Sequence, residues 1–332
     1  MRQLAGNLFL LVCFIIIALS CFTLRGLAQL PKLPQQEVDA LQEIATTMGA
    51  KYWTFNADAC RIETVGLTKK QTKGSQANTD CDCNFENSTV CHVATLTLKG
   101  FSLPGLLPPQ LVKLPYLRKI DFAITGCNKQ IPQEWASTKL TYISVLVNRL
   151  SGQIPKYLGH ITTLTFLNLE GNQFSGIVPT ELGNLVNLQT LMLSSNQLTG
   201  YLPETFSGLR ILNDFRINDN NFIGTLPDWV QNWKKLTRLE MHSSGLEGPI
   251  PSNISVLNNL EELVLRNCNI SGEIPAYIWS MKNLEMLDVS FNKLAGQLPS
   301  TIGAERLKFV FLTGNLLSGN VPRSILRDGS VV

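Results

Sequence analysis

The sequence predicts an α/β solenoid, a stack of similar coils in which each coil adds one short strand to a long parallel sheet. Three observations support this prediction. Prolines recur at a nearly constant interval of 24 residues, as from Pro155 to Pro179 and Pro203. Paired leucines such as Leu191 and Leu193 alternate with polar residues, as in a strand buried on one face. An Asn follows the strand in most periods.

The proline period sets the extent of the solenoid. It runs from Pro108 to Pro322 at intervals of 24 residues, with two intervals of 23. A fixed period of about 20–29 residues is typical of leucine-rich repeats, in which each coil buries its apolar face only against its neighbours. We assign the solenoid to residues 93–322, with about ten repeats, and a short uncapped tail to residues 323–332.

The Asn after each strand is expected to satisfy buried backbone groups. The chain turns sharply there, and a stacked amide side chain can bond to the backbone of the neighbouring coil. Ser244 and Cys268 replace the Asn in two coils, and Thr125 replaces it in an early one. Cys268 and Cys127 are therefore expected to be small buried thiols that lie too far apart to pair. The Asn positions are Asn148, Asn172, Asn196, Asn220, Asn292 and Asn315.

Residues 1–28 are predicted to be a secretory signal. Arg2 precedes a nearly continuous apolar run from Leu8 to Leu19, and Gly26 and Ala28 are small residues at the positions that a signal peptidase inspects. Cleavage after Ala28 would give a secreted chain. The alternative is an uncleaved signal anchor on the outer face of the plasma membrane, because the apolar run approaches membrane length.

Residues 29–92 are predicted to form an N-terminal cap. Val38, Leu41, Ile44 and Met48 recur at helical spacing and are followed by Gly49, a common helix stop. Such a helix, together with the cysteine-rich segment after it, would cover the first coil of the solenoid. A stack of coils needs a cover of this kind at its exposed end.

The cap cysteines are expected to form two disulfides, because a secreted chain matures in an oxidising compartment. Four cysteines allow three connectivities, of which we prefer Cys60–Cys81 and Cys83–Cys91. The alternative is a zinc site that also uses His92. We disfavour this alternative because a second well-spaced ligand pair is missing from the sequence.

The charge balance argues against nucleic acid as a partner. The chain has a formal net charge of +3 at pH 7, and both signs are spread along it without a basic stripe. The three histidines, His92, His160 and His242, fall in separate coils, and the sequence shows no nucleophile–base arrangement or metal cluster. We therefore expect no enzyme activity, no cofactor and no bound metal.

The repeat L-x-x-L-x-L-x-x-N-x-L-S/T-G-x-I/L-P resembles the plant-specific class of leucine-rich repeats. The segments TLTLKG, HSSGLEGPIP, VLRNCNISGEIP and LDVSFNKLAGQLP are similar to plant receptor-like serine/threonine kinases whose ectodomain joins such repeats to a malectin-like domain. The resemblance implies a right-handed superhelix with a parallel concave β-sheet. It also implies a role in cell-surface signalling.

The sequence departs from that family in one important respect. The family continues into a malectin-like domain, a membrane helix and a kinase, whereas this sequence contains no glycine-rich nucleotide loop, His-Arg-Asp or Asp-Phe-Gly motif. Kinase activity is therefore not inferred from the resemblance. We expect either a truncated product or a chain that continues in a longer relative, with membrane contact only through a missing C-terminal part or an uncleaved signal anchor.

The outward residues of the predicted strands form the candidate binding face. Guanidinium groups in the middle coils suit a carboxylate, a phosphate or an acidic sugar. The alternative is a solvated face whose cations pair with Asp214, Glu240 and Glu262. A second candidate is an aromatic pair on early strands, whereas Phe291, Phe309 and Phe311 are expected to meet a C-terminal module. The candidate ligand-binding residues are Arg216, Arg238, Glu240, His242, Arg266, Tyr142 and Phe166.

Three Asn-x-Ser/Thr sequons, at Asn87, Asn253 and Asn269, are predicted glycosylation sites in a secreted chain. The leading functional hypothesis is an extracellular receptor-type ectodomain that binds a peptide, a cell-wall carbohydrate or a co-receptor ectodomain. The alternative is a free secreted inhibitor or binding protein of the kind that inhibits plant polygalacturonases.

Overall fold

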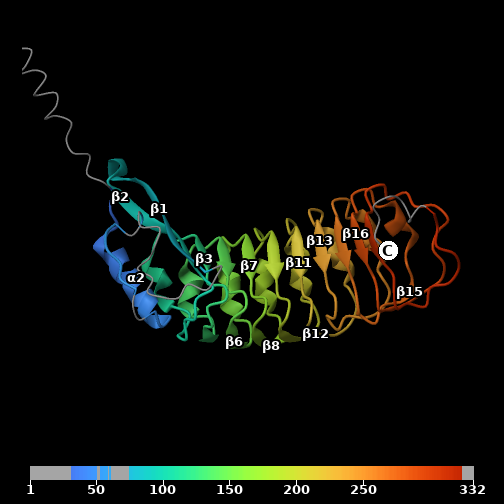
Figure 1. Cartoon of the computed structure of the whole chain (residues 1–332), viewed down its shortest axis with the longest axis horizontal. Helices are drawn as coiled ribbons and strands as arrows, with labels where there is room; N and C mark the ends of the chain where they lie inside the picture. The colour runs from blue at the N-terminus through green and yellow to red at the C-terminus, as the bar shows by residue number, and fades with distance from the viewer. Residues whose placement is uncertain (1–30, 51–52, 59, 61–74, 324–332) are drawn as a thin grey trace, which may run out of the picture.

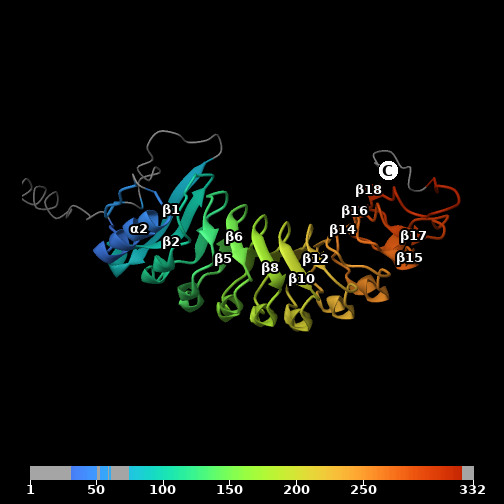
Figure 2. The same ribbon diagram turned by 90° about the horizontal axis from the view of Figure 1, so that it is seen from below.

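The computed structural model describes residues 31–50, 53–58, 60 and 75–323. The predicted signal, residues 1–28, and all but the first residue of the predicted tail lie outside these ranges. The described chain is an elongated stack of coils with the cap at one end (Figure 1). Turned by 90°, it is a shallow crescent with short helices along the convex edge (Figure 2).

The main sheet has 11 strands, and all of them run parallel except the first pair. An antiparallel hairpin of β1 (Gln76–Phe85) and β2 (Val90–Lys99) opens it, and β2 then pairs in parallel with the first coil strand. The predicted boundary between cap and solenoid, at residues 92 and 93, therefore falls within β2, which belongs to both. The remaining strands are β3 (Lys119–Asp121), β5 (Tyr142–Ser144), β7 (Phe166–Asn168), β9 (Thr190–Met192), β11 (Asp214–Arg216), β13 (Arg238–Glu240), β14 (Glu262–Val264), β16 (Met286–Asp288) and β18 (Phe309–Phe311).

A second parallel sheet follows the turn after each main strand. It has five strands in the order β12-β10-β8-β6-β4, and a separate pair lies further along the stack. The repeat pattern in the sequence did not predict this sheet. Its strands are β4 (Asn128–Lys129), β6 (Arg149–Gly152), β8 (Gln173–Ile177), β10 (Gln197–Gly200) and β12 (Asn221–Phe222), and the pair is β15 (Ser271–Glu273) and β17 (Lys293–Ala295).

The convex side is made of single 3₁₀ turns. Proline precedes each turn from η3 onward, where its fixed φ favours a helical start, and each turn has only five residues. The sequence predicted an α/β solenoid, but among the described residues the only α-helix is α2 (Gln35–Thr47). The turns are η1 (Glu86–Ser88) in the cap hairpin, then η2 (Pro109–Lys113), η3 (Gln133–Ser137), η4 (Lys156–His160), η5 (Thr180–Asn184), η6 (Glu204–Gly208), η7 (Asp228–Asn232), η8 (Ser252–Val256) and η9 (Ala276–Ser280).

The predicted asparagine ladder is present and bonded. Nδ2 of Asn196 donates to the carbonyl oxygens of Leu169 (3.1 Å) and Leu193 (3.0 Å). Its Oδ1 accepts from the backbone N–H of Phe174 in the preceding coil (3.0 Å). Each ladder residue thus satisfies buried backbone groups of two coils. Cys268 occupies a ladder position as a buried free thiol whose Sγ lies 2.8 Å from the Met241 carbonyl oxygen, and Cys127 is also buried and free.

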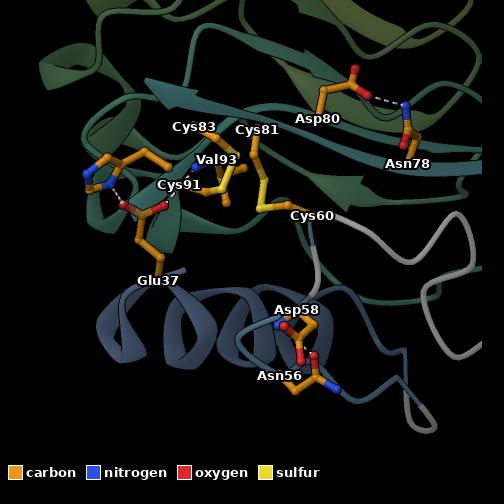
Figure 3. The surroundings of a disulfide bond; sticks show 11 residues. Glu37, Asn56, Asp58, Cys60, Asn78, Asp80, Cys81, Cys83, Cys91 and Val93 are labelled. Carbon is orange, nitrogen blue, oxygen red and sulfur yellow. Dashed lines mark hydrogen bonds and ion pairs between the residues drawn. A yellow bond between two sulfur atoms is a disulfide. The ribbon is translucent and has the colours of Figure 1, made fainter. Parts of the chain in front are cut away.

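The cap follows the prediction closely. Helix α2 ends at Thr47, and Gly49 adopts a φ of 84°, which is accessible to glycine without strain. The structure joins Cys60 to Cys81 and Cys83 to Cys91, the pairing preferred from the sequence (Figure 3). These sulfurs are therefore not available as zinc ligands. Among the described residues, no group of three or more His, Cys, Asp or Glu is arranged to hold a metal.

Candidate ligand-binding face

The main sheet places one outward residue of every coil in a single column. Parallel register aligns Asp121 with Ser144, and the alignment continues through Arg216 and Glu240 to Phe311. The column has the order predicted from the sequence, because inward residues such as Leu191 and Phe215 are buried and fix the alternation. A second outward column, which includes Asp214 and Arg238, flanks it.

Arg216 is engaged by an acidic neighbour on its own strand. Its Nε and Nη2 donate to the two carboxylate oxygens of Asp214 at 2.9 and 2.7 Å, a bidentate arrangement. This hydrogen bonding raises the pKa of Arg216 further above its already high value. The guanidinium of Arg216 therefore stays charged, and an anionic ligand would have to compete with Asp214 for it.

Arg238 is also paired, with carboxylates on two strands. Its Nη2 lies 2.5 Å from Glu262 on the next strand, and its Nη1 lies 3.5 Å from Glu240. The solvated, ion-paired alternative therefore describes Arg216 and Arg238 in this structure. The side chains of these pairs are only 17–33% exposed, so solvent screens them less than it screens ion pairs at the open surface.

Glu170 lies two residues beyond the end of β7, close enough to Arg216 for their charges to interact. Burial raises the pKa of its carboxyl above the ordinary value of 4.5, and the positive charge of Arg216 opposes this rise. Glu170 is not among the candidate ligand-binding residues predicted from the sequence. The rise in its pKa comes from burial of this one side chain, and a repeat pattern does not predict how deeply a single side chain is buried.

Arg266 differs from the other two arginines. Its guanidinium carbon lies 5.0 Å from the ring centroid of Phe291, a cation–π contact, and it has no ion pair within the described part of the chain. A hollow of about 520 Å³ opens beside it, lined by His242, Val264, Arg266, Asp288 and Phe291 among others. His242 contributes to this hollow while its Nδ1 lies 3.7 Å from Asp219.

A second hollow, of about 730 Å³, continues from the first and shares Arg266, Asp288 and Phe291 with it. It adds Phe311 and the last described coil. The sequence analysis assigned Phe291 and Phe311 to a C-terminal junction and did not include Asp288 in the site. Phe291 could have been identified as a site residue from its position directly before the ladder residue Asn292. The backbone there has a φ of 56°, and the ring points outward.

Tyr142 and Phe166 form the predicted aromatic pair on adjacent strands. Their rings are stacked, with centroids 4.1 Å apart and planes at 7°. Burial and the nearby Asp121 carboxylate raise the pKa of the Tyr142 phenol. In the order of the main sheet, β9, β11 and β13 separate the pair from the strand that precedes Arg266. The structure thus shows two separate patches on one face.

The three sequons differ in their surroundings. Asn87 is exposed at the tip of the cap hairpin. Asn269 is exposed just before β15, and its Nδ2 donates a long, exposed hydrogen bond (3.3 Å) to the Glu247 carboxylate. Asn253 is only partly exposed, and its Nδ2 donates to the carbonyl oxygen (2.7 Å) and to Oδ1 (3.0 Å) of Asp228 in the preceding coil. The amide of Asn253 is therefore already used in holding two coils together.

Comparison with known proteins agrees with the fold. The family model described as "Leucine rich repeat" matches residues 162–222 and 186–246, and that described as "Leucine Rich repeats (2 copies)" matches residues 258–301. In Arabidopsis thaliana, "Probable LRR receptor-like serine/threonine-protein kinase RFK1" is 50% identical over 115 residues, which cover 35% of this chain and 11% of that protein. A second such kinase, At1g07650, is 42% identical over 140 residues, 41% of this chain and 14% of that protein.

Solved structures extend the likeness over most of the chain. The leucine-rich-repeat ectodomain of the Arabidopsis thaliana membrane receptor kinase GASSHO1/SCHENGEN3, in complex with CASPARIAN STRIP INTEGRITY FACTOR 2, has a TM-score of 0.72 and 27% identity over 88% of this chain and 34% of that one. The plant peptide hormone receptor RGFR1, in complex with RGF2, has a TM-score of 0.63 and 30% identity over 66% of this chain and 36% of that one.

The matched regions span far less than two thirds of either kinase or either receptor chain. None of the helices in the described ranges is long and apolar enough to span a bilayer. The described chain has its long parallel sheet, its cap helix and its disulfides in common with plant receptor ectodomains. It is a leucine-rich-repeat solenoid similar to the leucine-rich-repeat portion of plant receptor-like serine/threonine kinases.

Proposed function

We propose that this chain is an extracellular ligand-binding ectodomain of the receptor-like kinase type, of the subgroup that carries a malectin-like domain. In this proposal it takes part in cell-surface signalling by binding a peptide along the concave face. The ectodomains of GASSHO1/SCHENGEN3 and RGFR1 are similar in fold and were solved in complex with CASPARIAN STRIP INTEGRITY FACTOR 2 and RGF2. Their likeness supports a peptide over the other partner classes.

The observation that carries the proposal is the state of Arg266. Arg216 and Arg238 are already paired with carboxylates, whereas Arg266 lies against Phe291 at the edge of the 520 Å³ hollow. A cation that is held by an aromatic ring and faces an open hollow can accept a carboxylate without first breaking an ion pair. The adjoining hollow, with Phe311 and Leu312, offers apolar surface for a neighbouring side chain.

The test uses the purified chain and a peptide fraction from plant culture medium. Peptides retained on the immobilised chain are identified by mass spectrometry, and their affinity is then measured with synthetic copies. We expect Arg266→Ala to weaken binding about tenfold, as the loss of one charge-assisted contact does. Arg210→Ala is the matched control, since it removes the same charge from an exposed position next to η6 on the convex side.

Two outcomes would contradict the proposal. One is an equal loss of affinity in both variants, which would show a general charge effect instead of a site at Arg266. The other is retention of a cell-wall hydrolase with no bound peptide, which would favour the second candidate function, a free secreted inhibitor of the polygalacturonase-inhibitor kind. Occupied glycosylation sites are expected under both functions.

A further inference from the structure

The tip of the cap hairpin carries a glycosylation sequon close behind an aromatic residue. Residues 85–89 are Phe-Glu-Asn-Ser-Thr, so Phe85 precedes Asn87 by two positions. Asn87 is exposed, and Phe85, the last residue of β1, is partly exposed. A sugar attached to Asn87 therefore starts only two residues from an aromatic ring.

Phe85 belongs to a group of three rings, with His92 and Tyr116, which we call the cap aromatic cluster. The ring centroid of Phe85 lies 4.5 Å from that of His92 and 4.5 Å from that of Tyr116, and the last two are 4.1 Å apart. The three residues come from β1, from β2 and from the segment before β3, so the cluster joins the hairpin to the first coil. Tyr116 keeps 37% of its surface exposed. The cluster is thus an apolar surface that is still partly open to solvent.

The cap aromatic cluster is held in place from two sides. Nδ1 of His92 contacts the carboxylate of Glu37, a buried residue of α2. Cys91, the residue before His92, is joined to Cys83 across the hairpin by a disulfide. The rings therefore form a surface that is ordered before anything binds to it, and a contact with them does not have to order them first.

The backbone of the hairpin tip is unfavourable by itself. Glu86, Asn87 and Ser88 have φ values of 45°, 56° and 65°, a left-handed conformation that residues other than glycine adopt at a cost and seldom in succession. Hydrogen bonds from Thr89 oppose this cost. Its N–H donates to the carbonyl oxygens of Phe85 (3.2 Å) and Glu86 (3.3 Å), and its hydroxyl donates to that of Glu86 (2.8 Å). Such a conformation persists only where the surrounding contacts fix it, so a further contact at the tip should slow its opening.

We propose that the first N-acetylglucosamine of a glycan on Asn87 packs on the cap aromatic cluster, chiefly on Phe85, and stabilises the tip of the hairpin. One face of this sugar ring presents C–H groups, whose partial positive charge is attracted to the electron-rich face of an aromatic ring. The covalent bond to Asn87 keeps the sugar beside the cluster, so the contact is intramolecular and costs little entropy. The proposal rests on the predicted passage of the chain through the secretory pathway and is independent of the proposed ligand-binding function.

The other two sequons lack this arrangement. Asn267 lies two residues before Asn269, and Pro251 lies two residues before Asn253, so neither sequon has an aromatic side chain at the position of Phe85. A protein partner is a weaker candidate for the same rings, because a glycan on Asn87 would stand beside them and hinder its approach.

The test uses the whole chain, produced in cells that make only oligomannose glycans, and mass spectrometry first measures occupancy at Asn87. Endoglycosidase H then leaves a single N-acetylglucosamine on each occupied asparagine, whereas the Asn87→Gln variant carries no sugar at the tip. Amide hydrogen exchange of residues 76–99 is compared between the two, with the disulfides reduced in the acid quench. We expect the tip amides of Asn87→Gln to exchange about fivefold faster, as the loss of one aromatic contact predicts.

Phe85→Leu isolates the role of the ring, since it keeps an apolar side chain of similar size. In this variant the loss of the sugar should change the exchange rate by less than about twofold, because the contact that couples the two is gone. The matched control is Asn269→Gln, which removes a sugar from an exposed sequon without an aromatic neighbour two residues before it. It should leave the exchange of the hairpin unchanged.

Three results would overturn the proposal. The first is an Asn87 that carries no glycan. The second is equal exchange with and without the sugar in the otherwise unmodified chain, which would leave the cluster as a surface for a protein partner. The third is a sugar effect that persists undiminished in Phe85→Leu, because the sugar would then act without the ring. All three are measured without a ligand and away from Arg266, so a failure here is distinct from a failure of the proposed function.

Discussion

Glu37 on helix α2 accepts a 2.8 Å hydrogen bond from the backbone N–H of Val93, 56 residues further along the chain. Its other carboxylate oxygen contacts Nδ1 of His92. Only 3% of Glu37 is exposed. A single buried carboxylate therefore ties the cap helix to β2, the strand that begins the parallel sheet.

This contact predicts a large effect of Glu37→Ala. The substitution leaves the Val93 N–H buried without a partner, which costs about 1–3 kcal/mol in the free energy of unfolding. Urea denaturation followed by circular dichroism measures the loss. Glu43→Ala is the control on the same helix, since its half-exposed pair with Lys113 should contribute less than about 1 kcal/mol. Equal losses in the two variants would show that the cap does not depend on the buried contact.

The asparagine ladder gives a second stability prediction. Asn196→Ala removes the donor to Leu169 and Leu193 and the acceptor for Phe174, so several buried backbone groups lose their partner. We expect a loss of about 3 kcal/mol. The neighbouring Gln197→Ala, on the exposed face, should stay within about 0.5 kcal/mol of the unmodified chain. A loss below about 1 kcal/mol for Asn196→Ala would mean that water or relaxation of the coil replaces the ladder bonds.

The sequence predicted the columns of the main sheet in the correct order. The proline period fixes the length of each coil, and the alternation of buried leucines fixes which strand residues point outward. It also predicted the ladder and the preferred disulfide pairing. It could not decide whether Arg216 and Arg238 are free or paired, since that depends on rotamers across neighbouring strands. The contact of Arg266 with Phe291 likewise depends on the backbone turn at Phe291.

The second sheet was missed for a related reason. Its strands follow the turn at the ladder residue, and β6 and β10 end at a glycine with positive φ, Gly152 and Gly200. The S/T-G-x-I/L-P segment therefore did not look like a strand, because glycine interrupts the alternation of buried and exposed positions. The pairing of these strands depends on how neighbouring coils stack, which a single repeat does not encode.

The sequon at Asn253 is predicted to be occupied far less than those at Asn87 and Asn269. A glycan on Nδ2 would disturb its hydrogen bonds to Asp228, and Oδ1 of Asn253 is already buried without a partner among the described residues. Peptide mapping after enzymatic deglycosylation measures occupancy at each site. Asp228→Ala removes the bond to Oδ1 and keeps the bond to the backbone carbonyl oxygen, so it should raise occupancy at Asn253 only in part. Full occupancy at Asn253 in the unmodified chain would contradict the prediction.

Glu170 predicts a specific dependence of stability on pH. Burial raises its folded pKa above 4.5, so just above pH 4.5 the folded chain keeps a proton that the unfolded chain has released. The protonated Glu170 carboxyl therefore stabilises the folded chain fully below pH 4.5, and this stabilisation is lost as the pH rises through the folded pKa. Glu170→Gln should remove this dependence, so that the variant is the more stable protein at neutral pH and its advantage disappears in acid. Because the charge of Arg216 lowers this pKa, Arg216→Ala should move the NMR titration of the Glu170 carboxyl to higher pH, and a shift to lower pH would contradict the account.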